Sequence, residues 1–187
     1  MEKGKAYLAI DPGSKGCIAI QSDKGREYYF ICELDYYQLS EVFAKIREEY
    51  DDITCVMEQI HAIYGSSAKA TFSFGEINGV LLGLLCANKI PYTLIPPKEW
   101  QMCMWTNTDK EYDYKLVKDK NGVYVNKKTV NTKKTSINAA KRLFPTEDFR
   151  RNPKCKNIDD NKVDALLMSE YARRKNLLKI TLCTQSN

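Results

Sequence analysis

The stretch AYLAIDPGSKGCIAI, residues 6–20, decides the fold. Residues 6–10 and 17–20 are short apolar runs of the kind that form β-strands. Between these runs lie a proline and two glycines, which are turn residues. We therefore predict a β-hairpin in which Asp11, at the end of the first strand, stands at the mouth of the turn.

The rest of the chain alternates between strand and helix patterns. A run over residues 28–32 follows a second turn signal, so the first three strands should be antiparallel neighbours. The later patterns predict strands over 53–57 and 91–95, helices over 37–50, 67–88, 133–144 and 159–175, and a short helix over 98–105. The expected fold class is α/β, a mixed five-stranded sheet of three antiparallel strands followed by parallel strands, flanked by helices.

Length and charge bound the organisation of the chain. A chain of 187 residues can form one core, so we expect a single domain over residues 1–187. Residues from about 106 to 131 are polar, rich in Lys and Tyr, and are predicted to be an inserted loop or hairpin. The net charge is +5, and residues 106–157 carry 14 Lys and Arg against 6 Asp and Glu. This concentration of positive charge indicates a surface that meets a polyanion.

Other features exclude several classes of protein. The seven cysteines are scattered without a C-x-x-C pair, and His61 is the single histidine, which argues against a disulfide framework and a zinc cluster. The chain does not open with a basic segment and an apolar stretch, and its longest apolar run, residues 80–87, is too short to span a bilayer. We therefore expect a soluble, cytoplasmic protein with no membrane partner.

Four carboxylates stand where the predicted elements would bring them to one edge of the sheet. Asp11 ends the first strand, Glu58 ends the fourth, and Asp160 and Asp164 share one face of the last helix. Grouped carboxylates repel one another, so such a cluster typically holds hard cations such as Mg²⁺. Two Mg²⁺ ions about 4 Å apart can activate a water and stabilise the leaving oxygen of a phosphodiester.

Each acid also has a simpler interpretation. Asp11 before Pro-Gly is a favourable turn residue. Asp160 and Asp164 could have no role beyond a favourable interaction with the dipole of a helix N-terminus. Asp159 would be the N-cap of that helix. Glu58 is harder to explain in this way, because it closes the apolar run ITCVM. Asp164 shares its helix face with apolar residues, which favours a functional site.

The segments AIDPGSKGCIAI, CVMEQIHA and DDNKVDALLMSEYARR together resemble the successive acidic motifs of the RuvC-like Holliday junction resolvases. The resemblance covers most of the chain outside residues 106–131 and implies the RNase H-like fold of the retroviral integrase superfamily. Asp11, Glu58 and Asp164 match the family's acids residue by residue. For the fourth metal ligand the resemblance leaves Asp160, which we favour, and Asn161, which stands at the commoner spacing.

The resemblance also implies residues that bind DNA. Lys98 and Lys134, with Lys133 as an alternative to Lys134, stand where the family has lysines near the scissile phosphate. Their simpler interpretation is that of solvated surface lysines. The full set of candidate DNA-binding residues, in which the aromatic rings would stack on or wedge between bases, is Lys15, Tyr64, Phe72, Phe74, Lys98, Lys133 and Lys134.

The predicted helix over 67–88 carries Gly75, Gly79 and Gly83, one glycine every four residues. Such a stripe permits a close approach of another backbone, either of the sheet or of a second copy of the chain. In the similar resolvases the equivalent helix forms the dimer interface. A symmetric homodimer would place two equivalent active sites on a four-way junction.

Together these features predict a homodimeric endodeoxyribonuclease that resolves Holliday junctions, with Asp11, Glu58, Asp160 and Asp164 holding two Mg²⁺ ions per active site and Mn²⁺ as a substitute. Lys98 and Lys134 are the candidate catalytic lysines. The insertion suggests a phage or viral type acting in the host cytoplasm. The alternatives are a less selective fork or flap nuclease, an inactive junction-binding relative, and an ATP-binding protein of the actin and sugar-kinase fold, whose phosphate turn DPGSKG resembles.

Overall fold

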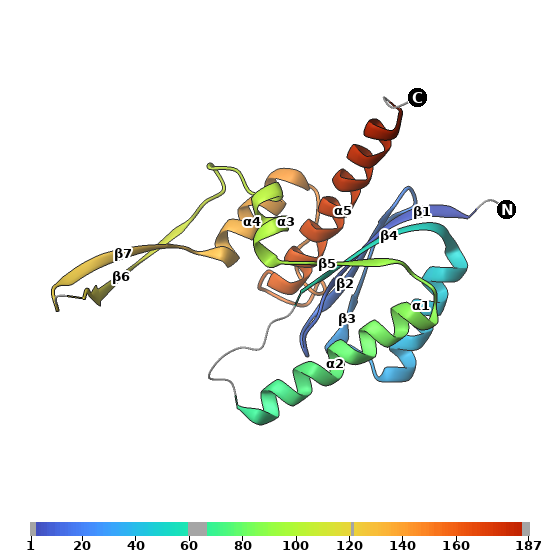
Figure 1. Cartoon of the computed structure of the whole chain (residues 1–187), viewed down its shortest axis with the longest axis horizontal. Helices are drawn as coiled ribbons and strands as arrows, with labels where there is room; N and C mark the ends of the chain where they lie inside the picture. Colours follow the sequence, from blue (N-terminus) through green and yellow to red (C-terminus); the bar gives the residue numbers. More distant parts are fainter. Residues whose placement is uncertain (1–2, 60–66, 121, 185–187) are drawn as a thin grey trace.

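The computed structural model describes residues 3–59, 67–120 and 122–184, with side chains as far as residue 176. The described residues form a five-stranded sheet between two layers of helices (Figure 1). Its strand order is β3-β2-β1-β4-β5. The strands are β1 (Gly4–Asp11), β2 (Cys17–Ser22), β3 (Gly25–Phe30), β4 (Tyr50–Glu58) and β5 (Tyr92–Ile95).

The pairing of these strands follows the predicted pattern. The first three strands form an antiparallel meander, β1 with β2 and β2 with β3. The other two pairs, β1 with β4 and β4 with β5, are parallel. The expected fold class, a mixed sheet of antiparallel and then parallel strands, is therefore confirmed.

Both faces of the central strands are buried. On β1, Leu8 and Ile10 belong to the core on one face of the sheet, while Ala9 between them belongs to the core on the other. On β4, Met57 and Val56 divide in the same way. This alternation follows from the two-residue period of a strand and explains why these strands are apolar throughout.

Helices cover the two faces as separate layers (Figure 1). The core on one face includes side chains of α1 (Tyr36–Glu49) and α2 (Ala68–Ala87). The core on the other face includes side chains of α3 (Pro97–Met104), α4 (Thr132–Leu143) and α5 (Asp160–Thr184). α5 is nine residues longer at its C-terminal end than the predicted helix over 159–175.

Several boundaries differ from the predicted ones. The strand predicted over 28–32 ends at Phe30, and a 3-10 turn (Ile31–Glu33) follows it. The first helix ends at Glu49, and Tyr50 already belongs to β4. The Tyr50 side chain is buried in the core and its hydroxyl lies 3.2 Å from that of Ser22. Tyr50 thus pairs with β1 through its backbone and contacts the end of β2 through its side chain.

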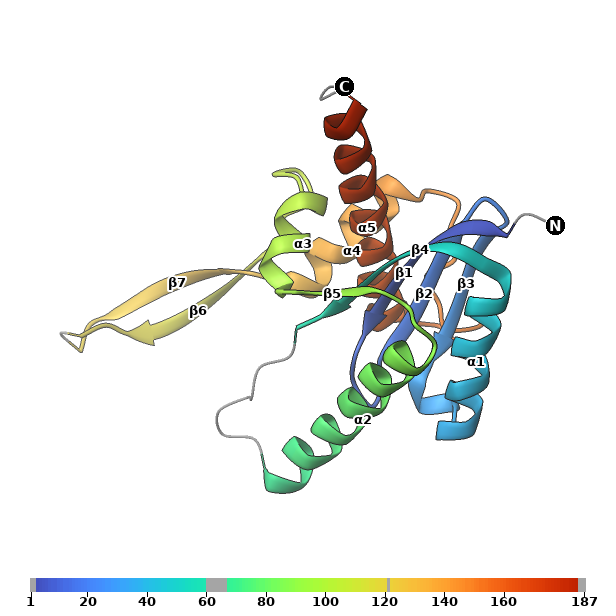
Figure 2. The ribbon, with the colours of Figure 1, turned by 45° about the vertical axis from the view of Figure 1, so that its right-hand side comes forward.

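The Lys- and Tyr-rich segment forms a hairpin of two strands, β6 (Tyr112–Lys118) and β7 (Tyr124–Val130). The hairpin is a separate two-stranded sheet and projects from the side of the molecule on which β4 ends (Figure 2). Its base leads directly into α4. The predicted loop or hairpin is thus an extended arm.

α2 is apolar but largely uncovered. Only a small part of α2 is buried, and by length and composition alone the helix could cross a membrane. This corrects the expectation that no segment of the chain is long and apolar enough. However, Ile77, Leu81 and Leu85 already pack into the protein core. The remaining residues of α2 are exposed or only partly buried.

The turn between β1 and β2 depends on Gly16. A Cβ at this position would lie 2.0 Å from the carbonyl oxygen of Asp11 and 2.8 Å from the backbone nitrogen of Gly13. A Cβ on Gly13 would lie 3.5 Å from the ring of Phe74 and 3.9 Å from the backbone nitrogen of Gly16, both ordinary contact distances. Only Gly16 is therefore required for the backbone to fold back onto Asp11.

We predict that Gly16→Ala lowers the free energy of unfolding by about 3 kcal/mol, because the backbone must move to relieve the overlap. The matched variant Gly13→Ala in the same turn is expected to change it by less than about 1 kcal/mol. Urea denaturation of both variants measures the difference. Equal stabilities would contradict the turn geometry described above.

Candidate active site

Two acidic residues end adjacent strands at one edge of the sheet. The parallel register of β1 and β4 pairs Ile10 with Met57, and the residues that follow are Asp11 and Glu58. Both side chains are partly exposed at this edge. The predicted juxtaposition of the first and fourth strands is confirmed, and it brings these carboxylates together.

The first turn of α5 brings two more carboxylates to the same edge. Asp159 caps the helix, as its Oδ1 accepts hydrogen bonds from the backbone N–H groups of Asn161 and Lys162, each at 3.1 Å. Asp160 and Asp164 follow, one helical turn apart, where α5 packs across β1, β2 and β4. Asn161 is turned toward the cap, with its side chain 3.4 Å from Asp159.

The four carboxylates act on one another electrostatically. Burial raises the pKa of Asp11 well above its ordinary value, and the charges of Asp164, Glu58 and Asp160 raise it further. Burial likewise raises the pKa of Asp164 to about 7, against a hydrogen bond from Ser136 that lowers it. Of the two candidates for the fourth ligand, Asp160 adds its charge to the cluster, whereas Asn161 is uncharged.

Three of these acids have a polar partner. The indole N–H of Trp100 donates to Glu58 Oε1 at 2.9 Å, and the Lys133 ammonium forms an ion pair with Asp160. Burial raises the pKa of Asp160, but the hydrogen bond and charge of Lys133, a backbone hydrogen bond and the charge of Lys15 together bring it below its ordinary value. Asp164 is bonded to Ser136, yet its Oδ1 is buried with no hydrogen-bond partner among the described residues. A buried carboxylate oxygen without a partner is unfavourable unless something else binds it.

The donor set fits a hard divalent cation, although the side chains do not yet surround one. Within the described residues, no three Asp, Glu, His or Cys side chains are arranged so that they could hold a metal ion. Asp160 is held by Lys133 and Glu58 by Trp100. These carboxylates must turn before they can share a cation. Nevertheless, the carboxylates provide oxygen ligands, repel one another and leave one oxygen without a hydrogen bond. Mg²⁺, a hard cation that binds oxygen, would compensate for all of this.

The candidate lysines are not equivalent. Lys133 contacts Asp160, and the charge of Lys15, in the turn after β1, lowers the pKa of Asp160. Lys134 is exposed, and its backbone N–H donates to the N-cap of α4. Lys98 is exposed in the first turn of α3. Between the alternatives in α4, it is Lys133 rather than Lys134 that reaches the carboxylates.

The candidate aromatic residues are distributed over α2 and the segment before it. Phe74 packs near Gly13 in the turn that carries Asp11. Phe72 is 74% exposed. Tyr64 lies outside the described residues. Phe74 is therefore the described aromatic candidate that lies beside the acidic edge.

Trp100 and Ser136 were not predicted from the sequence. Trp100 forms a hydrogen bond with Glu58, and Ser136 forms one with Asp164. Each lies two residues after a predicted lysine, Trp100 after Lys98 and Ser136 after Lys134. The polar N–H of a tryptophan in a short amphipathic helix was the available signal for Trp100, because a buried indole usually finds an acceptor. Ser136 carries no comparable signal in the sequence.

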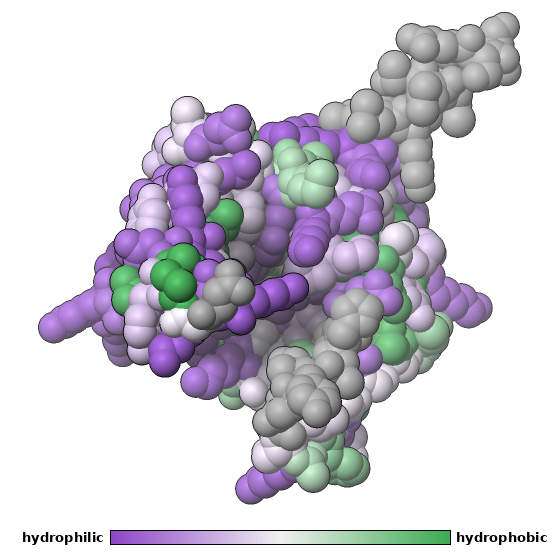
Figure 3. Space-filling model, turned by 60° about the vertical axis from the view of Figure 1, so that its left-hand side comes forward, coloured by the Kyte–Doolittle hydropathy of each residue, from purple (hydrophilic) through white to green (hydrophobic). Residues whose placement is uncertain are grey.

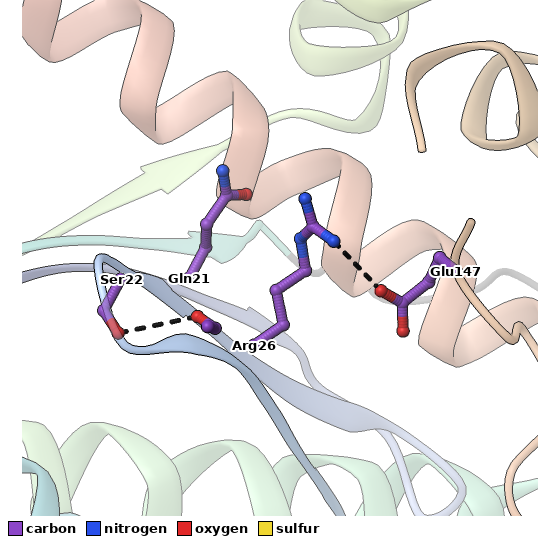
Figure 4. Close-up of a pocket in the computed structure, with 5 residues that line it drawn as sticks. Gln21, Ser22, Arg26 and Glu147 are labelled. Atoms are coloured by element: carbon purple, nitrogen blue, oxygen red, sulfur yellow. Dashed lines mark hydrogen bonds and ion pairs between the residues drawn. The ribbon is translucent and has the colours of Figure 1, made fainter. Parts of the chain in front are cut away.

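A separate hollow of about 310 Å³ lies at the opposite end of the sheet. Figure 4 shows its lining residues, among them Gln21, Ser22, Arg26 and Glu147. Arg26 and Glu147 form an ion pair at 3.1 Å, so these charges are already satisfied. None of the predicted site residues lines this hollow.

The raised pKa of Asp164 makes stability depend on pH. The folded protein holds this proton more tightly than the unfolded chain, so without divalent ions the free energy of unfolding should fall as pH rises from about 4 to about 7. Asp164→Asn should flatten this decline and be more stable than the wild type at pH 8 by about 1 kcal/mol or more. Denaturant titrations across this pH range measure both effects.

The matched control is Asp148→Asn. Arg150 holds the pKa of Asp148 at about 2, below its ordinary value, so this carboxylate contributes stability that is lost only as pH falls. The control should leave the decline between pH 4 and 7 in place. An unchanged decline in Asp164→Asn as well would show that Asp164 is not the buried group.

Comparisons with known proteins agree with this fold. The sequence matches no protein-family model, and no curated protein is significantly similar to it. The structure is similar to that of Thermus thermophilus RuvC in complex with a Holliday junction substrate, with a TM-score of 0.50 and 9% identity over 91% of this chain and 95% of that chain. A second Thermus thermophilus RuvC structure matches with a TM-score of 0.46 and 12% identity, over 91% and 96% of the two chains. The first likeness, together with the strand order, shows that the chain has an RNase H-like fold.

Proposed function

We propose that the protein is a metal-dependent endodeoxyribonuclease that makes symmetric nicks in four-way DNA junctions by phosphodiester hydrolysis. The observation that carries the proposal is the group of four carboxylates at the end of β1 and β4. Burial and mutual charge raise the pKa of both Asp11 and Asp164 there. Such an arrangement is unfavourable alone and is stabilised by a divalent cation.

Asp11, Glu58, Asp160 and Asp164 would hold Mg²⁺, with Mn²⁺ as a substitute and two ions per site. When bound, these cations supply the charge that activates a water and stabilises the leaving oxygen. The protein's own contribution is to fix the oxygen donors on rigid elements, two strands of the sheet and the first turns of α5. Trp100 orients Glu58 through its hydrogen bond.

The lysines around this edge would bind the substrate. Lys133 pairs with Asp160 in the free protein, and a cation at the carboxylates would release its ammonium toward a phosphate. Lys15 and Lys98 are exposed and can neutralise the DNA backbone. Lys134 would act beside them from the first turn of α4. Lys98 and Lys133 or Lys134 are thus our candidates for stabilising charge that develops at the scissile phosphate.

Two further features support a junction as the substrate. Residues 106–157 carry a net charge that is strongly positive, as a polyanion requires. The similar RuvC structure contains a Holliday junction. A junction has two equivalent strands to cut, so the proposal includes a homodimer with two active sites.

α2 is the proposed dimer interface. The positions where a Cβ would stand on Gly75, Gly79 and Gly83 have no atom within 4 Å, apart from the backbone of α2 itself, so this stripe does not pack against the described parts of the chain. The interpretation of the glycines as a packing surface for the sheet is therefore wrong. An exposed stripe of glycines on an apolar helix suits the close approach of a second copy.

Asp11→Asn tests the proposed nuclease. We expect the cleavage rate of a four-way junction in Mg²⁺ to fall by at least about 100-fold, because loss of even an outer-shell partner of a metal costs about 10–100-fold. Calorimetric titration with Mg²⁺ should show weaker cation binding, while junction binding in EDTA stays near wild type. The control Asp52→Asn removes an exposed carboxylate from the other end of β4 and should cut normally.

The choice of substrate is tested with the wild type. Equal amounts of a four-way junction, a fork with a flap and a linear duplex are offered at one salt concentration, because backbone binding depends strongly on salt. We expect paired nicks in the junction and slower cutting of the other two. If the fork and the junction are cut at equal rates, the protein is not a selective resolvase but a less selective branched-DNA nuclease.

Gly79→Arg tests the dimer. Since open space surrounds Gly79 in the single chain, the variant should fold, but the long charged side chain should separate two copies. We expect light scattering to give the mass of a dimer for the wild type and of a monomer for the variant. The control is Glu41→Arg at an exposed position of α1, and this variant should stay dimeric. A monomeric wild type would refute this interface.

A further inference from the structure

The two faces of the β6–β7 hairpin differ in composition. In the register of the strands, Tyr114 lies opposite Lys128 and Lys118 opposite Tyr124, and side chains alternate between the faces. One face therefore carries all three tyrosines of the hairpin. We call it the tyrosine face; it consists of Tyr112, Tyr114, Leu116, Lys118, Tyr124, Asn126, Lys128 and Val130. The opposite face has lysines but no aromatic side chain.

The tyrosine face is uncovered. Tyr114 is 64% exposed and Tyr124 is 63% exposed, and Leu116 between them is equally open. Figure 3 views the molecule from the side on which the hairpin projects, and hydrophobic side chains are interspersed there with hydrophilic ones. Large aromatic groups kept in water along one face of an arm are typical of an interaction surface.

Lysines stand beside these rings. The ammonium of Lys128 lies 3.8 Å from the centroid of the Tyr112 ring, and that of Lys118 lies 5.2 Å from the Tyr124 ring. These cation–π contacts hold rings and charges next to one another on one surface. The hairpin as a whole, residues 112–130, carries five Lys and two Asp. The surface thus alternates flat rings with positive charge.

The base of the hairpin is fixed to the helix that reaches the acidic edge. Asp109, just before β6, is buried, and Arg142 of α4 donates to both of its carboxylate oxygens at 2.9 and 2.7 Å. Asn131, which follows β7, donates its backbone N–H to Glu111 at 2.8 Å and caps α4. Two residues later, Lys133 contacts the carboxylate cluster. The arm is therefore anchored relative to the proposed active site.

A hollow of about 530 Å³ lies between α3 and the base of the hairpin. Its lining includes Lys98, Lys110 and Trp105 together with Val130 at the end of β7. Lys98 is one of the lysines proposed to meet the scissile phosphate. Positive charge thus extends from the acidic edge past this hollow to the tyrosine face.

We infer that the β6–β7 hairpin is a DNA-binding arm whose tyrosine face takes an unpaired stretch of the substrate strand, with the tyrosine rings on the bases and Lys118 and Lys128 on the phosphates. The inference rests on the proposed function and adds a second contact with the branched substrate. Unpaired bases are specified because a ring can stack only on a base face that pairing and stacking leave open.

Other occupants fit the arm less well. A second copy of the chain, with a net charge of +5, offers a basic surface less negative charge than a nucleic acid strand does. A bilayer would leave the unpaired edges of both strands without hydrogen-bond partners. A nucleic acid strand supplies both base faces for the rings and negative charge for the lysines.

The experiment measures binding of the full chain in EDTA, which prevents cutting, by fluorescence anisotropy. The probes are a single-stranded oligonucleotide, a fork with single-stranded arms and a linear duplex. The double variant Tyr114→Ala/Tyr124→Ala should raise the Kd for the first two probes by about 10-fold or more and leave the duplex nearly unchanged. Tyr114→Phe/Tyr124→Phe keeps the rings and should bind like the wild type.

Two lysine pairs provide a matched comparison. Lys118→Ala/Lys128→Ala changes the tyrosine face, and Lys115→Ala/Lys127→Ala makes the same charge change on the opposite face. The first pair should reduce the slope of log Kd against log salt for the single strand by about 1.4, since each lost contact contributes about 0.7. The second pair should leave that slope unchanged.

Each other outcome overturns the inference. Equal losses from the two lysine pairs would mean that only general positive charge acts. Tyrosine variants that bind normally but lose self-association in light scattering would assign the face to a second copy. If the wild type cuts junctions and all hairpin variants bind DNA equally well, the hairpin is not a DNA-binding arm, but the proposed nuclease activity is supported. A wild type that neither binds nor cuts DNA ends the proposed function itself.

Discussion

The central constraint on this structure is the repulsion among carboxylates that lie together at one edge of the sheet. Parallel pairing of β1 and β4 places Asp11 beside Glu58, and α5 adds Asp164 from above. Burial is the largest cause of the raised pKa of both Asp11 and Asp164, and the neighbouring carboxylates raise it further. The folded chain must therefore supply protons or positive charge at this point. Trp100 donates to Glu58, and the Lys133 ammonium pairs with Asp160.

The core makes this conflict tolerable. β1 and β4 are buried on both faces, so apolar packing on either side holds the strand ends in place despite the repulsion. Trp100, Ser136 and Lys133 each meet one carboxylate and reduce its cost. These partners come from α3 and α4, which pack on one face of the sheet. One layer of helices thus supports the acidic edge, while the other carries the open glycines of α2.

α4 joins the acidic edge to the exposed arm. Its first turn holds Lys133 at the carboxylates, and Arg142 near its end holds Asp109 at the base of the hairpin. The first turn of α4 therefore lies next to both the base of the hairpin and the acidic edge. The basic arm and the acidic cluster have opposite charges, so a polyanion would be attracted to the arm and repelled by the cluster without bound cations.

The sequence by itself determined the fold class and the acids that end the strands. Alternating apolar runs, the turn containing Gly16 and the helical spacing are local signals, and each predicted strand and helix is present with shifted ends. The roles of Asp11, Glu58, Asp160 and Asp164 remain predictions. Only the tertiary structure decided which groups contact them, because Lys133, Trp100 and Ser136 meet the acids across distances that no local pattern encodes. It likewise decided that the glycines of α2 face open space and that the tyrosines of the arm share one face, since both depend on how whole elements pack and pair.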